Sequence, residues 1–473
     1  MLTLNLAVEA LTGSSPQFEE RLIRDAAIDS RQVTPESMFI ALEGERVDGH
    51  DYVQEAFERG ANSALVSREF SEDFYQLDLR KGWQADLPIE IGDAPVCLIV
   101  EDSLAAMQAI ARFWRRKLDL VVIGITGSVG KSTTKELIAE VLSQRYRTLK
   151  SPGNLNNEIG LPLTILQLNE EHERAVLEMG FYVPGEIEFL CDLAIPQVGV
   201  VTNIGTVHAE RAGTIEDIAR GKAELVEALP APPDGIAILN YDDPKVRAMA
   251  EKAKAEVFYY GMSPEADLWA DQVEGLGLDG IRFRLHYRHE VIHLRVPMIG
   301  RHSVHTALRA AAVGLTDGLS WQEIVNGLQS RNAQLRLVAV RARSGAIILD
   351  DTYNASPEST LAALNLLEDL EGRKIAVLGD MLELGQYEHQ GHTMVGARAA
   401  EVANELVTVG ERAKTIAASA ANAGLAANMI KSFEESNQVV DYLRDNLTSS
   451  DVVLVKGSRG MQMEIIVAEL ETS

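Results

Sequence analysis

The chain has few cysteines and no long apolar segment among its 473 residues. Its two cysteines, Cys97 and Cys191, are far apart and show no metal-ligand spacing, which predicts two buried thiols in a reducing cytosol. No stretch approaches the ~20 apolar residues of a membrane span. The N-terminal segment also lacks the basic and apolar parts of a signal peptide. We therefore expect a cytoplasmic protein without membrane insertion.

Basic residues are also scarce relative to acidic ones. The chain has 44 Lys and Arg against 70 Asp and Glu, which gives a formal net charge of −26. Binding to nucleic acid or to anionic lipid depends on clustered basic side chains, so this balance argues against both partners. We expect a soluble monomer that acts on small molecules.

The chain is too long for a single core, and its patterns predict an α/β protein of three domains. Residues 1–104 contain short strand and helix patterns, enough for a small α/β domain. Residues 105–331 alternate strand and helix, which predicts a mostly parallel sheet with helices on both faces, and period-two patterns at 267–298 add an antiparallel piece. Residues 332–473 repeat the alternation and predict a second, Rossmann-like doubly wound sheet.

A phosphate loop is predicted where an apolar run, a glycine turn and a helical pattern follow one another in VVIGITGSVGKSTTK. Backbone N–H groups and the positive end of a helix would face the phosphates there. Lys131 can reach the β- and γ-phosphates of ATP, and the Ser132 hydroxyl can bind Mg²⁺. The usual motif has a glycine five positions before Gly130, where this chain has Ile125. The alternative is therefore a glycine turn that only connects a strand to a helix. The predicted loop comprises Thr126, Gly127, Ser128, Val129, Gly130, Lys131, Ser132 and Thr133.

Polar residues then follow the next strands of the central region. The segment SPGNLNNEIGLPL (151–163) shows no strand or helix pattern, and its Asn154, Asn156 and Asn157 either hold a polar substrate or simply form turns. Glu178 closes one strand and His208 lies beyond another, so the two could hold a second Mg²⁺. Their alternatives are a solvated strand end and a hydrogen-bonded loop residue.

The third region offers carboxylates and cations at strand ends. Asp350, Asp351 and Asp380 follow apolar strands, and helix capping or turn formation is their alternative role. Lys456 and Arg459, beside glycines after the last strand, suit recognition of a carboxylate or phosphate, with a solvated loop as the alternative. In the central region, the position of Lys222 in a helix predicts a solvated surface charge.

Taken together, TGSVGKST, GNLNNEIGLPLT, LEMG, VTNIG, GRH, DDTYNASPES, GDMLELG and KGSRG resemble, in this order, the Mur ligase family. These are ATP- and Mg²⁺-dependent, three-domain enzymes of bacterial cell-wall precursor synthesis. The set is most similar to the member that joins D-alanyl-D-alanine to UDP-N-acetylmuramoyl-tripeptide through an acyl phosphate. Another member of the family or a folylpolyglutamate synthase is the first alternative. A P-loop NTPase switch that makes no amide bond is the second.

The resemblance also implies roles for individual residues. It assigns the second Mg²⁺ to Glu178 and His208, and it matches Lys222 to a lysine that is carbamylated in several members. The familiar GRHN-x-x-N pattern reads GRHSVHT here, with Ser303 and Thr306 in the asparagine positions. Leu335 replaces the glycine before the hinge arginine. The remaining matches are Ser30, Arg31, Gly44, Asp48 and His50 for the UDP-sugar, His302 for the adenine, Arg336 for the hinge, and Asp351 and Asn354 for the nucleotide.

Overall fold

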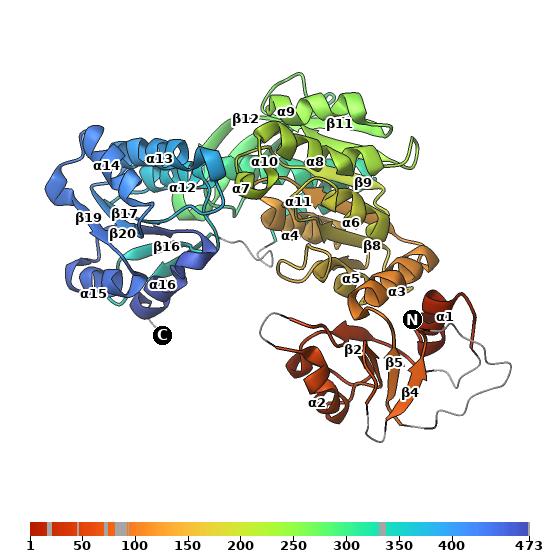
Figure 1. Ribbon diagram of the computed structural model, residues 1–473. Coiled ribbons are helices and arrows are strands. Elements are labelled where there is room, and N and C mark those ends of the chain that lie inside the picture. Colours follow the sequence, from red (N-terminus) through yellow and green to blue (C-terminus); the bar gives the residue numbers. More distant parts are fainter. Residues whose placement is uncertain are drawn as a thin grey trace. The chain divides into compact units, whose positions relative to one another are not determined.

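The computed structural model describes residues 1–16, 21–44, 47–70, 74–80, 92, 94–330 and 337–471. The chain divides into two compact units. The first unit comprises Met1–Gly124, Tyr146–Gly180 and Glu186–Val198. The second unit comprises Ile125–Arg145, Phe181–Gly185 and Gly199–Ser473. Three sheets, shown in Figure 1, lie one in each of the three predicted regions, which confirms the α/β class.

The N-terminal sheet is parallel, with strand order β1-β2-β3-β5-β4. Every residue of its central strands is buried, as expected for a parallel sheet covered on both faces. Cys97 lies in this core, and Cys191 is buried elsewhere, so the predicted pair of free buried thiols is confirmed. The elements are α1 (Leu4–Thr12), β1 (Asp25–Ala27), β2 (Ser37–Ile40), α2 (Val53–Glu58), β3 (Ser63–Val66), β4 (Tyr75–Asp78), β5 (Val96–Ile99) and α3 (Ser103–Lys117).

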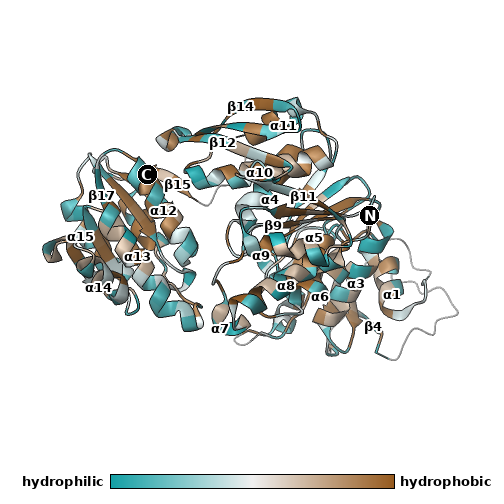
Figure 2. Ribbon diagram, turned by 90° about the horizontal axis from the view of Figure 1, so that it is seen from above, coloured by the Kyte–Doolittle hydropathy of each residue, from teal (hydrophilic) through white to brown (hydrophobic). Residues whose placement is uncertain are grey.

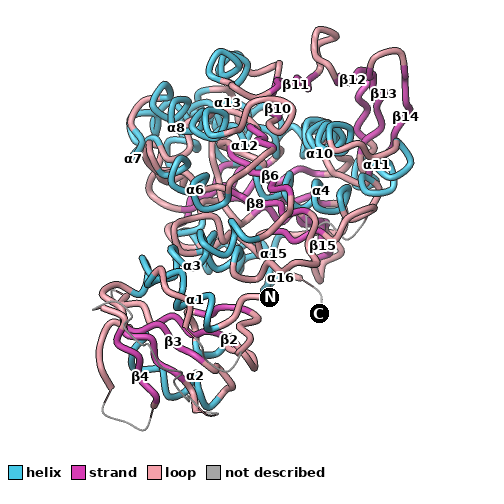
Figure 3. Tube along the Cα trace, turned by 90° about the vertical axis from the view of Figure 1, so that its right-hand side faces the viewer, coloured by secondary structure: helices cyan, strands magenta, loops and turns pink. Residues whose placement is uncertain are grey.

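The central sheet has the order β14-β13-β12-β11-β10-β9-β6-β8-β7. The period-two segments form antiparallel neighbours with the register Ile281↔Val296, which confirms that prediction, and Figure 3 shows them side by side. The strands are β6 (Val121–Thr126), β7 (Thr148–Lys150), β8 (Arg174–Glu178), β9 (Val198–Val201), β10 (Ile236–Asn240), β11 (Glu256–Gly261), β12 (Leu268–Gly275), β13 (Ile281–Tyr287) and β14 (Glu290–Val296).

The helices of the central region follow its strands closely in sequence. The segment 151–163 was predicted to contain neither strand nor helix, and this is wrong for its last residues. Helix α5 begins at Gly160. The Asn157 side chain accepts a hydrogen bond from the Gly160 backbone and so initiates that helix. The helices are α4 (Lys131–Leu142), α5 (Gly160–Ile165), α6 (Glu186–Ala194), α7 (Ala209–Ala212), α8 (Ile215–Ala228), α9 (Pro244–Arg247), α10 (Val304–Thr316) and α11 (Trp321–Leu328).

The C-terminal sheet has the order β15-β16-β20-β17-β18-β19, with β15 antiparallel at its edge. Separate apolar clusters cover its two faces, one with α12, α13 and α14 and the other with α15 and α16, which confirms the doubly wound prediction. The elements are β15 (Val338–Arg341), β16 (Ile347–Asp351), α12 (Pro357–Asp369), β17 (Arg373–Gly379), α13 (Glu388–Val402), β18 (Glu405–Val409), α14 (Lys414–Asn422), β19 (Ile430–Phe433), α15 (Ser436–Asn446), β20 (Asp451–Lys456) and α16 (Glu464–Leu470).

Short 3-10 segments complete the described chain. They are η1 (Ser30–Gln32), η2 (Gly49–Tyr52), η3 (Ala248–Lys252), η4 (Gly277–Asp279), η5 (Arg301–Ser303), η6 (Gly385–Tyr387), η7 (Ala427–Met429) and η8 (Arg459–Met461). Figure 2 shows apolar residues concentrated on the strands. Among the described residues, no helix has both the length and the apolar character needed to cross a bilayer. The domain boundaries predicted after residues 104 and 331 stay predictions. Helix α3 continues across residue 104, and residue 331 lies outside the described residues.

Gly221 in α8 provides a test of the packing around the central sheet. A Cβ at this position would lie 2.1 Å from Cε2 of Phe181, a fully buried ring. We expect Gly221→Ala to lower the unfolding temperature, because overpacking costs roughly 1–3 kcal/mol and outweighs the gain of about 1 kcal/mol in helix propensity. Calorimetry of this variant beside Arg220→Ala, an exposed change on the same helix, measures the effect. A Gly221→Ala protein as stable as the parent would contradict the packing described here.

Candidate functional site

The turn between β6 and α4 adopts a conformation that requires glycine at two positions. Gly127 has φ 142°, and a Cβ there would lie 1.9 Å from Oγ1 of Thr202. Gly130 has φ 84° and is the N-cap residue of α4, directly before Lys131. Only glycine adopts such backbone angles at little cost. The glycines of the predicted phosphate loop are therefore needed for its geometry.

The end of β9 holds this loop in place. Asn203 accepts hydrogen bonds at its backbone oxygen from the Ser128 N–H (3.0 Å) and at its side-chain oxygen from the Val129 N–H (2.9 Å). Thr202 donates its hydroxyl to the Val129 carbonyl at 2.7 Å. Neither residue was identified from the sequence as part of the site, although both stand in the motif VTNIG. Their contacts fix the orientation of the loop backbone before any ligand binds.

Lys131 and Ser132 occupy the first turn of α4. The Lys131 ammonium donates to the Gly127 carbonyl at 2.9 Å, so its charge lies against the loop. Ser132 is buried, and no side chain caps the helix start at Gly130. The predicted loop residues thus come together as a turn with a cation and a helix N-terminus, an arrangement suited to phosphate.

In the first unit, Glu178 ends β8 and is only 1% exposed, so the alternative of a solvated strand end is wrong. Its Oε1 accepts a hydrogen bond from the Asn156 amide at 2.9 Å. Asn154 is exposed, and the Asn157 side chain supports α5 as described above. The structure therefore links one predicted substrate residue, Asn156, to one predicted metal ligand.

In the second unit, His208 lies three residues after Gly205, whose N–H donates to the Ser128 hydroxyl of the phosphate loop at 2.8 Å. Nδ1 of His208 is 2.6 Å from Oε2 of Glu383, and the His208 ring packs edge-on against the Tyr182 ring. A carboxylate on one ring nitrogen is the usual means of orienting a histidine that binds a metal through the other.

Lys222 corrects a prediction made from helix position alone. Its side chain is not solvated: the residue is 1% exposed and its ammonium lies 4.3 Å above the ring of Phe181. A buried lysine in α8 is unusual, because lysine is rarely buried without a specific contact. The burial supports the role that the family resemblance implies for it.

The third region brings several predicted residues together. The Lys456 ammonium, 2% exposed, donates to the Asp351 carboxylate at 2.6 Å and to the Asn354 carbonyl at 2.8 Å, so its alternative as a solvated loop residue is wrong. Arg459 is exposed, with its guanidinium 5.1 Å from the Tyr353 ring.

Asp350 and Asp380 have the structural roles that were their alternatives. The Asp350 carboxylate accepts hydrogen bonds from the Thr352 N–H and hydroxyl in the turn after β16. The Asp380 carboxylate accepts a hydrogen bond from the Ala413 backbone N–H.

The residues predicted around the adenine divide into two groups. His302 is exposed in η5, whereas Ser303 and Thr306 are buried. The Ser303 hydroxyl donates to the Ile299 carbonyl at 2.8 Å. Arg336 and Leu335 lie outside the described residues.

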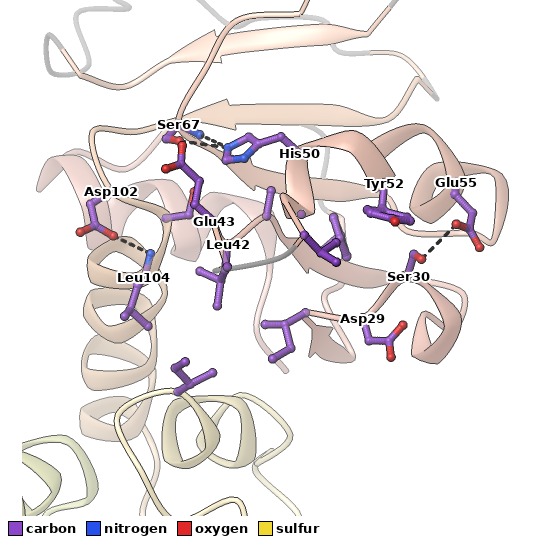
Figure 4. A pocket seen from close by; sticks show the side chains of 18 of the residues that line it. Asp29, Ser30, Leu42, Glu43, His50, Tyr52, Glu55, Ser67, Asp102 and Leu104 are labelled. Carbon is purple, nitrogen blue, oxygen red and sulfur yellow. Dashed lines mark hydrogen bonds between the residues drawn. The ribbon is translucent and has the colours of Figure 1, made fainter.

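A cavity of about 1110 Å³ in the first unit contains the residues predicted for the UDP-sugar. Ser30, Arg31, Gly44 and His50 line it, and Figure 4 labels Ser30 and His50 among the lining residues. Asp48 contacts the His50 ring. The Ser30 hydroxyl donates to Glu55 at 3.1 Å. Tyr52, Glu55, Ser103 and Ile159 also line the cavity and were not identified from the sequence, since they belong to no recognised motif.

His50 itself has both ring nitrogens engaged. Nε2 accepts a hydrogen bond from the Ser67 N–H at 2.9 Å (Figure 4). The proton is therefore on Nδ1, which donates to Asp48 at 2.6 Å. Desolvation raises the pKa of Asp48, but hydrogen bonds from His50 outweigh it and the pKa is lowered. Hydrogen bonds from Arg31 likewise lower the pKa of Asp29. Glu43, Asp48 and His50 lie close enough to form a metal site, but these bonds give His50 a structural role instead.

Comparison with known proteins agrees with this geometry. The Mur ligase middle domain matches residues 125–314, the glutamate ligase domain 335–459 and the Mur ligase catalytic domain 23–114. UDP-N-acetylmuramoyl-tripeptide--D-alanyl-D-alanine ligase of Bacillus subtilis is 35% identical over 97% of this chain and 95% of its own.

Solved structures give the same result. A crystal structure of MurF from Acinetobacter baumannii has a TM-score of 0.82 at 31% identity and covers 98% of both chains. MurF ligase from Thermotoga maritima in complex with ADP has a TM-score of 0.76 at 27% identity, covering 95% of this chain and 98% of the other. With similarity of this extent and a phosphate loop of this geometry, the chain belongs to the Mur ligase family.

Proposed function

We propose that this protein joins D-alanyl-D-alanine to UDP-N-acetylmuramoyl-tripeptide with ATP, as a cytoplasmic monomer in peptidoglycan precursor synthesis. The observation that carries the proposal is near full-length similarity to a ligase named for this reaction. The phosphate loop with Lys131 on its backbone supports the use of ATP. A large cavity in the N-terminal region gives the uridine nucleotide a place to bind.

The reaction requires two anions to meet. The terminal carboxylate of the tripeptide attacks the γ-phosphorus of ATP, which forms an acyl phosphate and releases ADP. The amine of D-alanyl-D-alanine then attacks the acyl carbon, and phosphate leaves with the carboxylate oxygen. Lys131 and the backbone N–H groups of the loop neutralise charge on the transferred group and align it, which is most of what phosphoryl transfer needs from a protein.

Each of the predicted Mg²⁺ ligands carries a donor group that suits the ion. Ser132 contributes a hydroxyl, Glu178 a buried carboxylate and His208 an imidazole oriented by Glu383. Bound Mg²⁺ would neutralise charge on the phosphates and on the attacking carboxylate. Asn156 holds the Glu178 carboxylate, and carbamylated Lys222 would supply a further oxygen donor.

The remaining predicted residues take substrate roles in this scheme. Lys456 orients Asp351 and the Asn354 backbone, which we assign with His302 to the nucleotide. Arg336 belongs to the hinge into the third domain. Exposed Arg459 and Asn154 contact substrate, as does Asn157. Ser30, Arg31, Gly44 and His50 line the cavity that we assign to the uridine nucleotide, and Asp48 holds the His50 ring.

Phosphate release separates this ligase from a P-loop switch. We expect release from ATP only when UDP-N-acetylmuramoyl-tripeptide and D-alanyl-D-alanine are both present, because the nucleotide reacts with a substrate carboxylate rather than with water. A coupled phosphate assay with each substrate omitted in turn measures this. Equal phosphate release without UDP-N-acetylmuramoyl-tripeptide and D-alanyl-D-alanine would contradict the proposal. Release that depends on a different amine acceptor would indicate another reaction of the same family.

Replacement of Lys131 tests the phosphate loop. Lys131→Ala should lower the ligation rate by at least roughly a hundredfold, because it removes the charge nearest the transferred phosphoryl group. The half-buried position of the side chain should leave the fold intact. Lys252→Ala, which removes a surface lysine paired with Glu227, is the matched control and should retain the parent rate. Ligation by Lys131→Ala at the parent rate would show that the loop assignment is wrong.

Replacement of Glu178 tests the proposed metal site. Glu178→Gln keeps the shape of the side chain but removes its charge, so the Mg²⁺ concentration for half-maximal ligation should rise by at least about tenfold. Exposed Glu188 on α6 provides the control Glu188→Gln. An unchanged Mg²⁺ titration for Glu178→Gln would leave its carboxylate with a structural role only.

A further inference from the structure

Arg309 is a buried cation that the proposed mechanism does not use. It lies in α10 and is 5% exposed. Its Nη1 donates to the Thr134 hydroxyl at 2.5 Å, and its guanidinium lies 5.7 Å from the Tyr260 ring centroid. Its Nε is buried without a hydrogen-bond partner. Arginine has five N–H donors, so this side chain is poorly satisfied for its depth.

Another buried arginine shows what a purely structural role looks like. Arg115, 3% exposed, donates to four backbone carbonyls, those of Ala194, Leu118, Leu120 and Ile195. Such partners offset the cost of removing a guanidinium from water. Arg309 lacks an equivalent set of acceptors.

No carboxylate among the described residues forms an ion pair with Arg309. Asp242 instead pairs with His305 at 2.9 Å, and Asp243 accepts hydrogen bonds from the backbone N–H groups of Ile204, Lys245 and Val246. Burial raises the pKa of Tyr260 to about 12, so its hydroxyl stays neutral. Burial also lowers the pKa of Arg309, and this effect exceeds the opposing contribution of the neighbouring Tyr260.

The location of this charge is unfavourable without an anion. The Arg309 Nη1 lies 3.2 Å from where a Cβ of Gly130 would be, which places the guanidinium beside the N-cap residue of α4. A helix N-terminus is already positive, and this one has no side-chain cap. A second positive group there is stabilised when a negative ligand occupies the phosphate loop.

We propose that Arg309 is a positioning residue for the triphosphate. Its guanidinium supplies a second fixed positive charge across the Gly130 backbone and anchors Thr134 of the phosphate-loop helix. The inference rests on the proposed function, because it takes the loop ligand to be a nucleotide. It adds a nucleotide-binding contribution from α10, the helix in which Thr306 replaces the usual asparagine and which Ser303 directly precedes.

The test compares nucleotide with nucleoside binding in the full-length protein. Arg309→Met keeps the length and apolar packing of the side chain but removes the charge, and Arg309→Lys restores a charge. Titration calorimetry with ADP, and displacement of ADP by adenosine, give the two affinities. We expect Arg309→Met to bind ADP roughly ten- to a hundredfold more weakly, with unchanged adenosine affinity and an unfolding temperature without ligand at or above that of the parent. Arg309→Lys should recover most of the ADP affinity.

Three results would overturn the inference. Parent-like ADP binding by Arg309→Met would show that the charge does not act on the phosphates. Equal losses for ADP and adenosine, or a ligand-free Arg309→Met that fails to fold, would show that the side chain is structural. Failure of the parent itself to bind ADP would instead count against the proposed function, so the two failures are distinguishable.

Discussion

The ammonium of Lys131 against the Gly127 carbonyl is the contact on which the functional interpretation depends. It places a cation against the turn at the point where a buried strand is followed by a helix. Thr202 and Asn203 hold that turn from the neighbouring strand end. Since the loop is already fixed, little reorganisation is needed when a phosphate arrives, which is the basis of electrostatic preorganisation.

Buried charge is the recurring feature of the predicted site residues. Glu178, Lys222 and Lys456 are each nearly inaccessible, and each has a contact from a different segment of the chain: an asparagine amide, an aromatic ring and an aspartate. Burial of charge costs free energy unless partners compensate, so a protein seldom keeps such groups for stability alone. Their burial fits the roles that we propose for them with anionic substrates and metal ions.

Local sequence patterns were sufficient for much of the fold. The glycine turn before Lys131, the polar ends of parallel strands and the period-two patterns at 267–298 each depend on neighbouring residues, and each is confirmed. The sequence could not reveal features set by distant contacts. The Phe181 ring covers Lys222, and Asp351 neutralises Lys456 from a strand more than a hundred residues away. Arg309 stands in an ordinary helical pattern, and only its approach to Gly130 distinguishes it.

Isotope transfer tests the central claim, chemical coupling of ATP to the substrate carboxylate, most directly. UDP-N-acetylmuramoyl-tripeptide labelled with ¹⁸O in its terminal carboxylate is incubated with ATP, D-alanyl-D-alanine and the protein, and the released phosphate is analysed by mass spectrometry. An acyl-phosphate mechanism predicts one labelled oxygen in each phosphate released, because the carboxylate oxygen leaves with the phosphoryl group. Phosphate carrying no label would contradict the account, since ATP would then have been hydrolysed by water.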